Sequence, residues 1–192
     1  MASQSLPLTN RVAIVTGASS GIGKSIATHL AEHGASVVLA ARRIEILDDI
    51  HTQLTEKGCK VSTFKADVTS VAEVGALVKH TVELYGRVDI LVNSAGVMYY
   101  TMMKNLHLEE WERMVDVNCK GVMNCIGAVL PQMLSQQSGH IINISSDAGR
   151  KVFPGLAVYS ATKFFVEALS QGLRLETANT GMSICVFKFV RL

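Results

Sequence analysis

Short apolar runs alternate with longer stretches of helical period along the chain, and this alternation constrains the fold more than any other feature. The apolar runs have the length of buried strands, and we expect strands at residues 11–16, 36–41, 60–65, 88–93, 140–144 and 182–189. The stretches between them predict helices over residues 22–33, 44–57, 70–84, 109–134 and 157–177. Strands that alternate with helices form βαβ units, and nearly continuous apolar strands indicate a sheet covered on both faces. We therefore predict a three-layer, doubly wound parallel α/β sheet of about six strands.

The chain has 192 residues, without a Pro/Ser-rich linker or an internal repeat, which predicts one domain over residues 1–192. Its net charge of +2 gives no reason to expect a nucleic acid or an anionic membrane as partner. No apolar run reaches the roughly 20 residues that span a bilayer, and the polar start lacks the pattern of a signal peptide. We expect a cytoplasmic protein.

The four cysteines form no metal-binding or redox motif. Cys59, Cys119, Cys125 and Cys185 include no C-x-x-C pair, and no histidine pattern completes a metal site. We expect four reduced thiols that behave as small, mostly buried apolar side chains, and no metal.

A glycine-rich turn joins the first predicted strand to the first predicted helix. It reads TGASSGIG over residues 16–23, with glycines at 17, 21 and 23. A helix N-terminus attracts anions, and glycine lets a diphosphate approach the backbone closely. Two other interpretations stay open here: a turn with no ligand, and a P-loop for a nucleoside triphosphate. The P-loop pattern would need glycine where Ala18 stands.

The end of the second predicted strand carries Arg42 and Arg43 where many dinucleotide-binding folds place a carboxylate for the adenosine ribose. A guanidinium offers forked donors that suit a 2′-phosphate. The pattern favours NADP over NAD. Two solvated arginines at a helix entrance are the alternative.

Tyr159 and Lys163 are four residues apart on one predicted helix, so both side chains share a face. A nearby ammonium favours the phenolate, and we expect Lys163 to lower the pKa of Tyr159. Such a tyrosine exchanges a proton with an alcohol or carbonyl as a hydride moves. Ser146, at the end of the fifth predicted strand, would hold the substrate oxygen against Tyr159.

Six motifs in order along nearly the whole chain resemble the short-chain dehydrogenase/reductase family. They are TGASSGIG at 16–23, Asp67-Val68, NSAG at 93–96, Val117-Asn118, Ser145-Ser146 and YSATK at 159–163. Each is weak alone, but six in the family's order are specific. The resemblance implies a Rossmann fold and an oxidoreductase. Ser94 departs from the asparagine or alanine that is commoner in the glycine motif.

The resemblance also implies roles for matched residues. Ser146 would orient the substrate, Tyr159 would be the acid or base, and Lys163 would also bind the nicotinamide ribose. Asn118 would hold a water that links Lys163 to solvent. Asp67 and Val68 would contact the adenine, and Asn93, Ala95 and Gly96 would stabilise the central sheet and line the cofactor. The complete expected cofactor site is Gly17, Ser19, Ser20, Gly21, Ile22, Gly23, Arg42, Arg43, Asp67, Val68, Asn93, Ala95, Gly96, Tyr159 and Lys163.

The sequence departs from the family at its C-terminal end. Phe189 and Val190 stand where a Pro-Gly turn is usual, and we expect the substrate-covering segment and a seventh strand to be absent. An edge strand would then keep unpaired backbone groups.

The predicted function is hydride transfer between NADP(H) and a secondary alcohol or carbonyl compound, by a homodimer or homotetramer. Apolar residues near the predicted pocket edge, Met98, Tyr99, Tyr100, Val152 and Phe153, indicate an apolar substrate site or ordinary packing. The alternatives are a non-catalytic NADP-binding or partner-binding subunit and an inactive truncated product.

Overall fold

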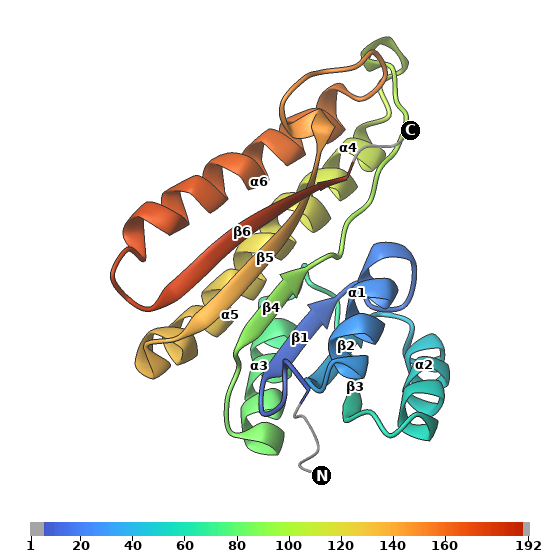
Figure 1. The fold of residues 1–192 in the computed structure, drawn as a ribbon. Helices are drawn as coiled ribbons and strands as arrows, with labels where there is room; N and C mark the ends of the chain where they lie inside the picture. Colours follow the sequence, from blue (N-terminus) through green and yellow to red (C-terminus); the bar gives the residue numbers. More distant parts are fainter. Residues whose placement is uncertain (1–5, 190–192) are drawn as a thin grey trace.

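A computed structural model describes residues 6–189 of the chain (Figure 1). The strands are β1 (Val12–Thr16), β2 (Ser36–Ala41), β3 (Val61–Lys65), β4 (Ile90–Asn93), β5 (Gly139–Ser146) and β6 (Met182–Phe189). The α-helices are α1 (Gly21–Glu32), α2 (Ile44–Glu56), α3 (Val71–Tyr85), α4 (Leu108–Val115), α5 (Gly121–Gln136) and α6 (Ala157–Glu176). Short 3₁₀ turns occur at Met103–Asn105 and Asp147–Gly149, and a π-helical turn at Asp116–Lys120.

The six strands form one sheet in the order β3-β2-β1-β4-β5-β6, and every neighbouring pair is parallel. The chain runs outward from β1 to β3 and then returns to place β4 against the other edge of β1. This reversal is the topological switch point of a doubly wound sheet, where ligands bind at the carboxyl ends of the strands. The predicted fold class is confirmed.

Two apolar clusters separate the helices into layers. One cluster joins the sheet to α3, α5 and α6, with Ile14, Leu77 and Ile141 fully enclosed. The other joins it to α1 and α2, with Val37 and Leu47 at its centre. The helices sit on both sides of the sheet because each presents one apolar stripe to it.

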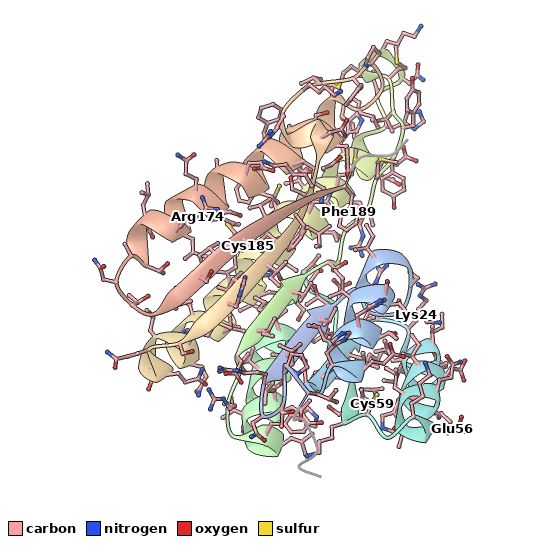
Figure 2. All side chains as sticks on the ribbon, viewed as in Figure 1. Lys24, Glu56, Cys59, Arg174, Cys185 and Phe189 are labelled. Carbon is pink, nitrogen blue, oxygen red and sulfur yellow. The ribbon has the colours of Figure 1, made fainter. Side chains whose placement is uncertain are left out.

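The part of the sheet made by β5 and β6 is covered less completely. Within residues 6–189, Ile141 and Ile184 face α6 and are buried, whereas Phe187 and Phe189, two and four residues beyond Cys185, are about half exposed. Figure 1 shows no helix in front of these two strands, and Figure 2 places Cys185 and Phe189 along β6. Val190, named in the sequence comparison with the family, lies outside the described residues.

The predicted continuous helix over residues 109–134 is wrong in one respect. The structure divides that stretch into α4, the π-helical turn and α5, all with helical backbone angles. The turn holds Asn118, whose side chain hydrogen-bonds to Val97, and this tertiary contact accompanies the change of helical pitch. The other predicted helices and strands appear with ends shifted by at most a few residues.

No helix among residues 6–189 has the length and apolar character needed to cross a membrane. The same residues contain no group of three histidine, cysteine or acidic side chains placed to hold a metal ion. All four cysteines are free thiols, two buried and two half-buried. Burial raises the pKa of the Cys125 thiol to about 12.

Candidate active site

The glycine turn after β1 packs tightly against the loop after β4. Gly17 has a left-handed φ of +65°, and a Cβ there would lie 2.8 Å from the Ala95 backbone. A Cβ on Gly23 would collide with the Gly17 carbonyl oxygen. The Thr16 hydroxyl accepts hydrogen bonds of 3.2 Å from the N–H groups of Ser94 and Ala95. The two loops therefore hold each other at the switch point.

Arg43, which follows β2, contacts the glycine turn. Its guanidinium donates hydrogen bonds of 2.9 Å to the Ser19 hydroxyl and 3.3 Å to the Ser20 hydroxyl. Ser20 is the N-cap of α1 but makes no side-chain capping bond, so the first N–H groups of the helix keep no side-chain partner. Free helix N–H groups beside a guanidinium form an anion site.

Asp67, after β3, lies between two arginines. Arg42 approaches its carboxylate to 3.9 Å and Arg113 to 3.6 Å. Burial by itself would raise the pKa of Asp67, but hydrogen bonds from the backbone and hydroxyl of Thr69, together with the two arginines, bring it below its ordinary value. The sequence interpretation missed Arg113, because nothing local connects α4 to the end of β3.

Ser146, Tyr159 and Lys163 come together as the sequence predicted. Ser146 is the last residue of β5, and the other two lie in the first two turns of α6. The Lys163 ammonium donates a 2.9 Å hydrogen bond to the Ile144 carbonyl and lies 5.6 Å from the centre of the Tyr159 ring. A hydrogen bond joins the Ser146 hydroxyl to the Tyr159 phenol.

The sequence predicts that Lys163 lowers the pKa of Tyr159, but in the structure this pKa is raised. Burial raises the pKa of Tyr159, the Ser146 hydrogen bond opposes that rise, and the charge of Asp147 adds to it. The net direction of the Tyr159 pKa is upward. Burial also lowers the pKa of the Lys163 ammonium, to about 8. Desolvation acts on both groups and outweighs the attraction that sequence spacing alone predicts.

Asn118 makes three hydrogen bonds within the protein. Its side-chain oxygen accepts from the Val97 N–H at 2.8 Å, and its amide group donates to the Val97 carbonyl at 2.8 Å and to the Thr162 hydroxyl at 3.1 Å. The side chain thus ties the loop after β4 to α6. Its expected role in holding a water beside Lys163 stays a prediction.

Asn93 lies beneath the site and belongs to a buried polar chain. Its amide donates a 2.8 Å hydrogen bond to Asn143, which donates 2.8 Å to the Ser170 hydroxyl, which donates 2.6 Å to the Val166 carbonyl. The chain links β4, β5 and α6 across the layer boundary. This geometry agrees with the expected role of Asn93 in stabilising the sheet.

One cleft of about 660 Å³ runs over the carboxyl ends of the strands. Ser146, Tyr159 and Lys163 line it together with most of the expected cofactor residues: Gly17, Ser19, Ser20, Ile22, Gly23, Arg42, Arg43, Asp67, Val68, Ala95 and Gly96. Gly21, Asn93 and Asn118 are not among its lining residues. Arg113 and Phe189 also line it and were not expected there, and Met98, expected near the pocket edge, lines it as well. Its volume is in the range of small-molecule and cofactor sites.

The loops beside the catalytic cluster are fastened to one another. The Thr101 N–H donates a 2.8 Å hydrogen bond to the Gly155 carbonyl, and the Trp111 indole donates 2.8 Å to the Thr101 hydroxyl. The Tyr100 ring packs on the Cα of Gly155, where a Cβ would collide with it. Tyr100 and Trp111 therefore hold residues 100–101 against Gly155 and α4.

Comparison with known proteins places this arrangement in a family. The family model described as "short chain dehydrogenase" matches residues 11–188. An oxidoreductase of Staphylococcus saprophyticus, itself uncharacterized, is 47% identical over 175 residues, which are 91% of this chain and 70% of that protein. The chain belongs to the short-chain dehydrogenase family. It is an oxidoreductase of that family with a Rossmann fold.

Two further relatives have a substrate or a cofactor in their names. Glycine betaine reductase of Emericella nidulans is 57% identical to this short-chain dehydrogenase over 178 residues, which are 93% of the chain but 14% of that protein's length. The solved structure of a metagenomic short-chain oxidoreductase in complex with NADP has a TM-score of 0.90 and 32% identity, covering 94% of this chain and 82% of its own.

A third solved structure gives the same likeness. A gluconate 5-dehydrogenase from Burkholderia cenocepacia, in complex with NADP and tartrate, has a TM-score of 0.90 and 30% identity. The match covers 98% of this chain and 74% of that one.

Proposed function

We propose that this short-chain dehydrogenase transfers a hydride between NADP(H) and a carbonyl compound or secondary alcohol, with Tyr159 as the acid or base. The observation that carries the proposal is that one cleft is lined both by the glycine turn before α1 and by a serine, tyrosine and lysine cluster. The NADP complexes of two solved relatives support the choice of cofactor. Residues 1–192 would act as one domain.

The residues around the turn fit NADP. The uncapped N-terminus of α1 offers N–H groups to the diphosphate, and Gly17 lets the turn before it pack closely on the Ala95 backbone. Arg43 already makes two hydrogen bonds to serine hydroxyls and would bind the 2′-phosphate, with Arg42 beside it. When bound, NADPH supplies the hydride for reduction.

The catalytic cluster favours proton donation. An ordinary phenol is protonated at neutral pH, and the raised pKa of Tyr159 keeps it so, which lets it donate to a carbonyl oxygen as the new C–H bond forms. The Ser146 hydroxyl holds the same oxygen. In the reverse direction Tyr159 accepts the alcohol proton. By the family's pattern Lys163 would bind the cofactor ribose, and its ammonium lies 5.6 Å from the centre of the Tyr159 ring.

The test is NADPH oxidation with a panel of aldehydes and ketones. The name of the glycine betaine reductase relative supports including a small aldehyde that carries a quaternary ammonium. We expect Tyr159→Phe to lower kcat by about a hundredfold or more while NADPH binding, measured by calorimetry, stays unchanged. Tyr85→Phe removes one hydroxyl from α3 and is the matched control.

Two outcomes would contradict the proposal. Equal rates for wild type and Tyr159→Phe would remove Tyr159 from the mechanism. Tight NADPH binding without turnover of any compound would favour a non-catalytic NADP-binding subunit. A homodimer or homotetramer stays a prediction, which the exposed Met123 on α5 and Phe164 on α6 support and sedimentation would test.

A further inference from the structure

A carboxylate, an aromatic ring and an ammonium meet directly beside Ser146. Asp147 follows Ser146 at the start of a 3₁₀ turn. The Lys151 ammonium lies 3.6 Å from a carboxylate oxygen of Asp147 and 5.0 Å from the centre of the Phe153 ring. A negative charge and an aromatic face together attract organic ammonium groups. The protein's own side chain therefore occupies a cation-binding corner next to the catalytic cluster.

This corner is connected to the proposed chemistry through Asp147. The Ser146 hydroxyl donates a 3.2 Å hydrogen bond to one oxygen of Asp147, and the other oxygen faces Lys151. The hydroxyl that would hold the substrate oxygen and the carboxylate that holds a cation are thus adjacent. A molecule that contacts both would need a short carbon chain between its carbonyl group and an ammonium.

A ligand ammonium can displace the Lys151 side chain. That side chain is 64% exposed, whereas that of Asp147 is 27% exposed. An exposed ion pair four residues apart contributes little free energy, so a ligand ammonium can replace it at small cost. Asp147 is also the one acidic residue in the two loops beside the catalytic cluster, residues 94–107 and 147–156.

We propose that Asp147 and Phe153 form a subsite for the cationic head of the substrate, and that the Lys151 ammonium fills this subsite when substrate is absent. The substrate class is a small aldehyde, or the corresponding alcohol, that carries a quaternary or protonated amine. This inference rests on the function proposed above and names its substrate class.

Two aldehydes of equal shape and different charge test the subsite. Trimethylammonioacetaldehyde carries a positive charge, and 3,3-dimethylbutanal is its neutral isostere. We expect wild type to favour the cationic aldehyde by about tenfold in kcat/KM, and Asp147→Asn to abolish the preference. Glu83→Gln, which removes the carboxylate of another exposed ion pair four residues apart, is the control and should keep it.

The two aldehydes also separate a binding role from a structural one. If Asp147→Asn lowers kcat/KM equally for both aldehydes, Asp147 acts only through Ser146 and the proposal is overturned. Lys151→Met should lower KM for the cationic aldehyde severalfold and leave that for the neutral one unchanged, while Lys151→Arg should behave as wild type. An unchanged KM for the cationic aldehyde in Lys151→Met would show that Lys151 does not fill the subsite.

Binding without turnover distinguishes failure of the subsite from failure of the proposed function. Calorimetry on the NADP-loaded protein would compare choline with 3,3-dimethylbutan-1-ol, its neutral isostere. Selective choline binding that Asp147→Asn removes would support the subsite even if no aldehyde is reduced, and the proposed function alone would then fail. Reduction of both aldehydes with equal binding of the two alcohols would overturn the subsite and leave the proposed function intact.

Discussion

The Lys163 ammonium donates its hydrogen bond to the Ile144 carbonyl rather than to the Tyr159 hydroxyl, although the two side chains are one helical turn apart. The lysine is therefore anchored to β5 and buried, with 8% of its surface exposed. Its position fixes the start of α6 relative to the strand that carries Ser146. Keeping the Lys163 ammonium charged in this buried position lowers the free energy of unfolding by an amount that depends on pH.

Lys163 should make stability rise with pH in a defined window. Burial lowers the pKa of Lys163 from 10.5 in the unfolded chain to about 8 in the folded one. Between these values the unfolded state binds more protons, so the free energy of unfolding increases as pH rises. Relative to Lys163→Met, wild type should gain about 2 kcal/mol between about pH 7.5 and pH 9.5, measured by urea unfolding.

The comparison with Lys163→Met cancels the groups that titrate independently of Lys163, whereas the nearby Cys119 thiol is coupled to it. Below about pH 7 the difference between the two proteins should be constant, because Lys163 is protonated in both states. A difference that does not change with pH across the window would show that Lys163 titrates normally.

Arg43 should determine the choice between the two nicotinamide cofactors. Arg43→Ala removes the guanidinium that bonds to Ser19 and Ser20, and NADPH binding should weaken about ten- to a hundredfold. Binding of NADH should change little, because it lacks the 2′-phosphate. Calorimetry with both cofactors measures the ratio, and Lys79→Ala on α3 is the control. An equal loss for NADH would assign Arg43 a structural role.

Gly17 should tolerate no side chain. In Gly17→Ala the new Cβ would lie 2.8 Å from the Ala95 backbone at a left-handed φ, and we expect a loss of about 3 kcal/mol or more in the free energy of unfolding. Gly58→Ala has a similar φ of +78° with nothing within 4 Å of the Cβ, and should cost about 1–2 kcal/mol. Equal losses would show that the clash is relieved elsewhere.

Ser170 should matter for stability although it is far along α6 from the catalytic cluster. Ser170→Ala removes the hydrogen-bond partner of the buried Asn143 amide, and the free energy of unfolding should fall by about 1–3 kcal/mol. Ser135→Ala on the exposed face of α5 should change it by less than about 0.5 kcal/mol. Thermal unfolding of both variants gives the comparison. No loss in Ser170→Ala would mean that another group satisfies Asn143.

The layered fold could be predicted from the sequence because its strands and most of its helices carry local sequence signals. The apolar run at β2 and the Ser70 N-cap of α3 are examples, and the structure shows Ser70 accepting a hydrogen bond from the Glu73 N–H. The π-helical turn could not be predicted in this way. It accompanies the contact between Asn118 and Val97, which only the folded chain brings together.

Some features of the candidate site could likewise be predicted from the sequence, and others depend on the folded chain. Spacing places Tyr159 and Lys163 on one face of α6, and the strand–turn–helix order locates the glycine turn, so their proximity could be predicted. The direction of the Tyr159 pKa could not, because it depends on burial and on the charge of Asp147. Arg113 reaches Asp67 from a helix that is distant in sequence, which local patterns do not reveal.

The strand order has a consequence for synthesis. A nascent chain can pair β1 with β2 soon after both leave the ribosome, but the second edge of β1 is occupied by Ile90–Val92. Gly17 likewise rests on Ala95. The second edge of β1 therefore stays unpaired until Ile90–Val92 have been translated, and the cleft cannot be completed before Lys163 and Phe189, which also line it, have followed.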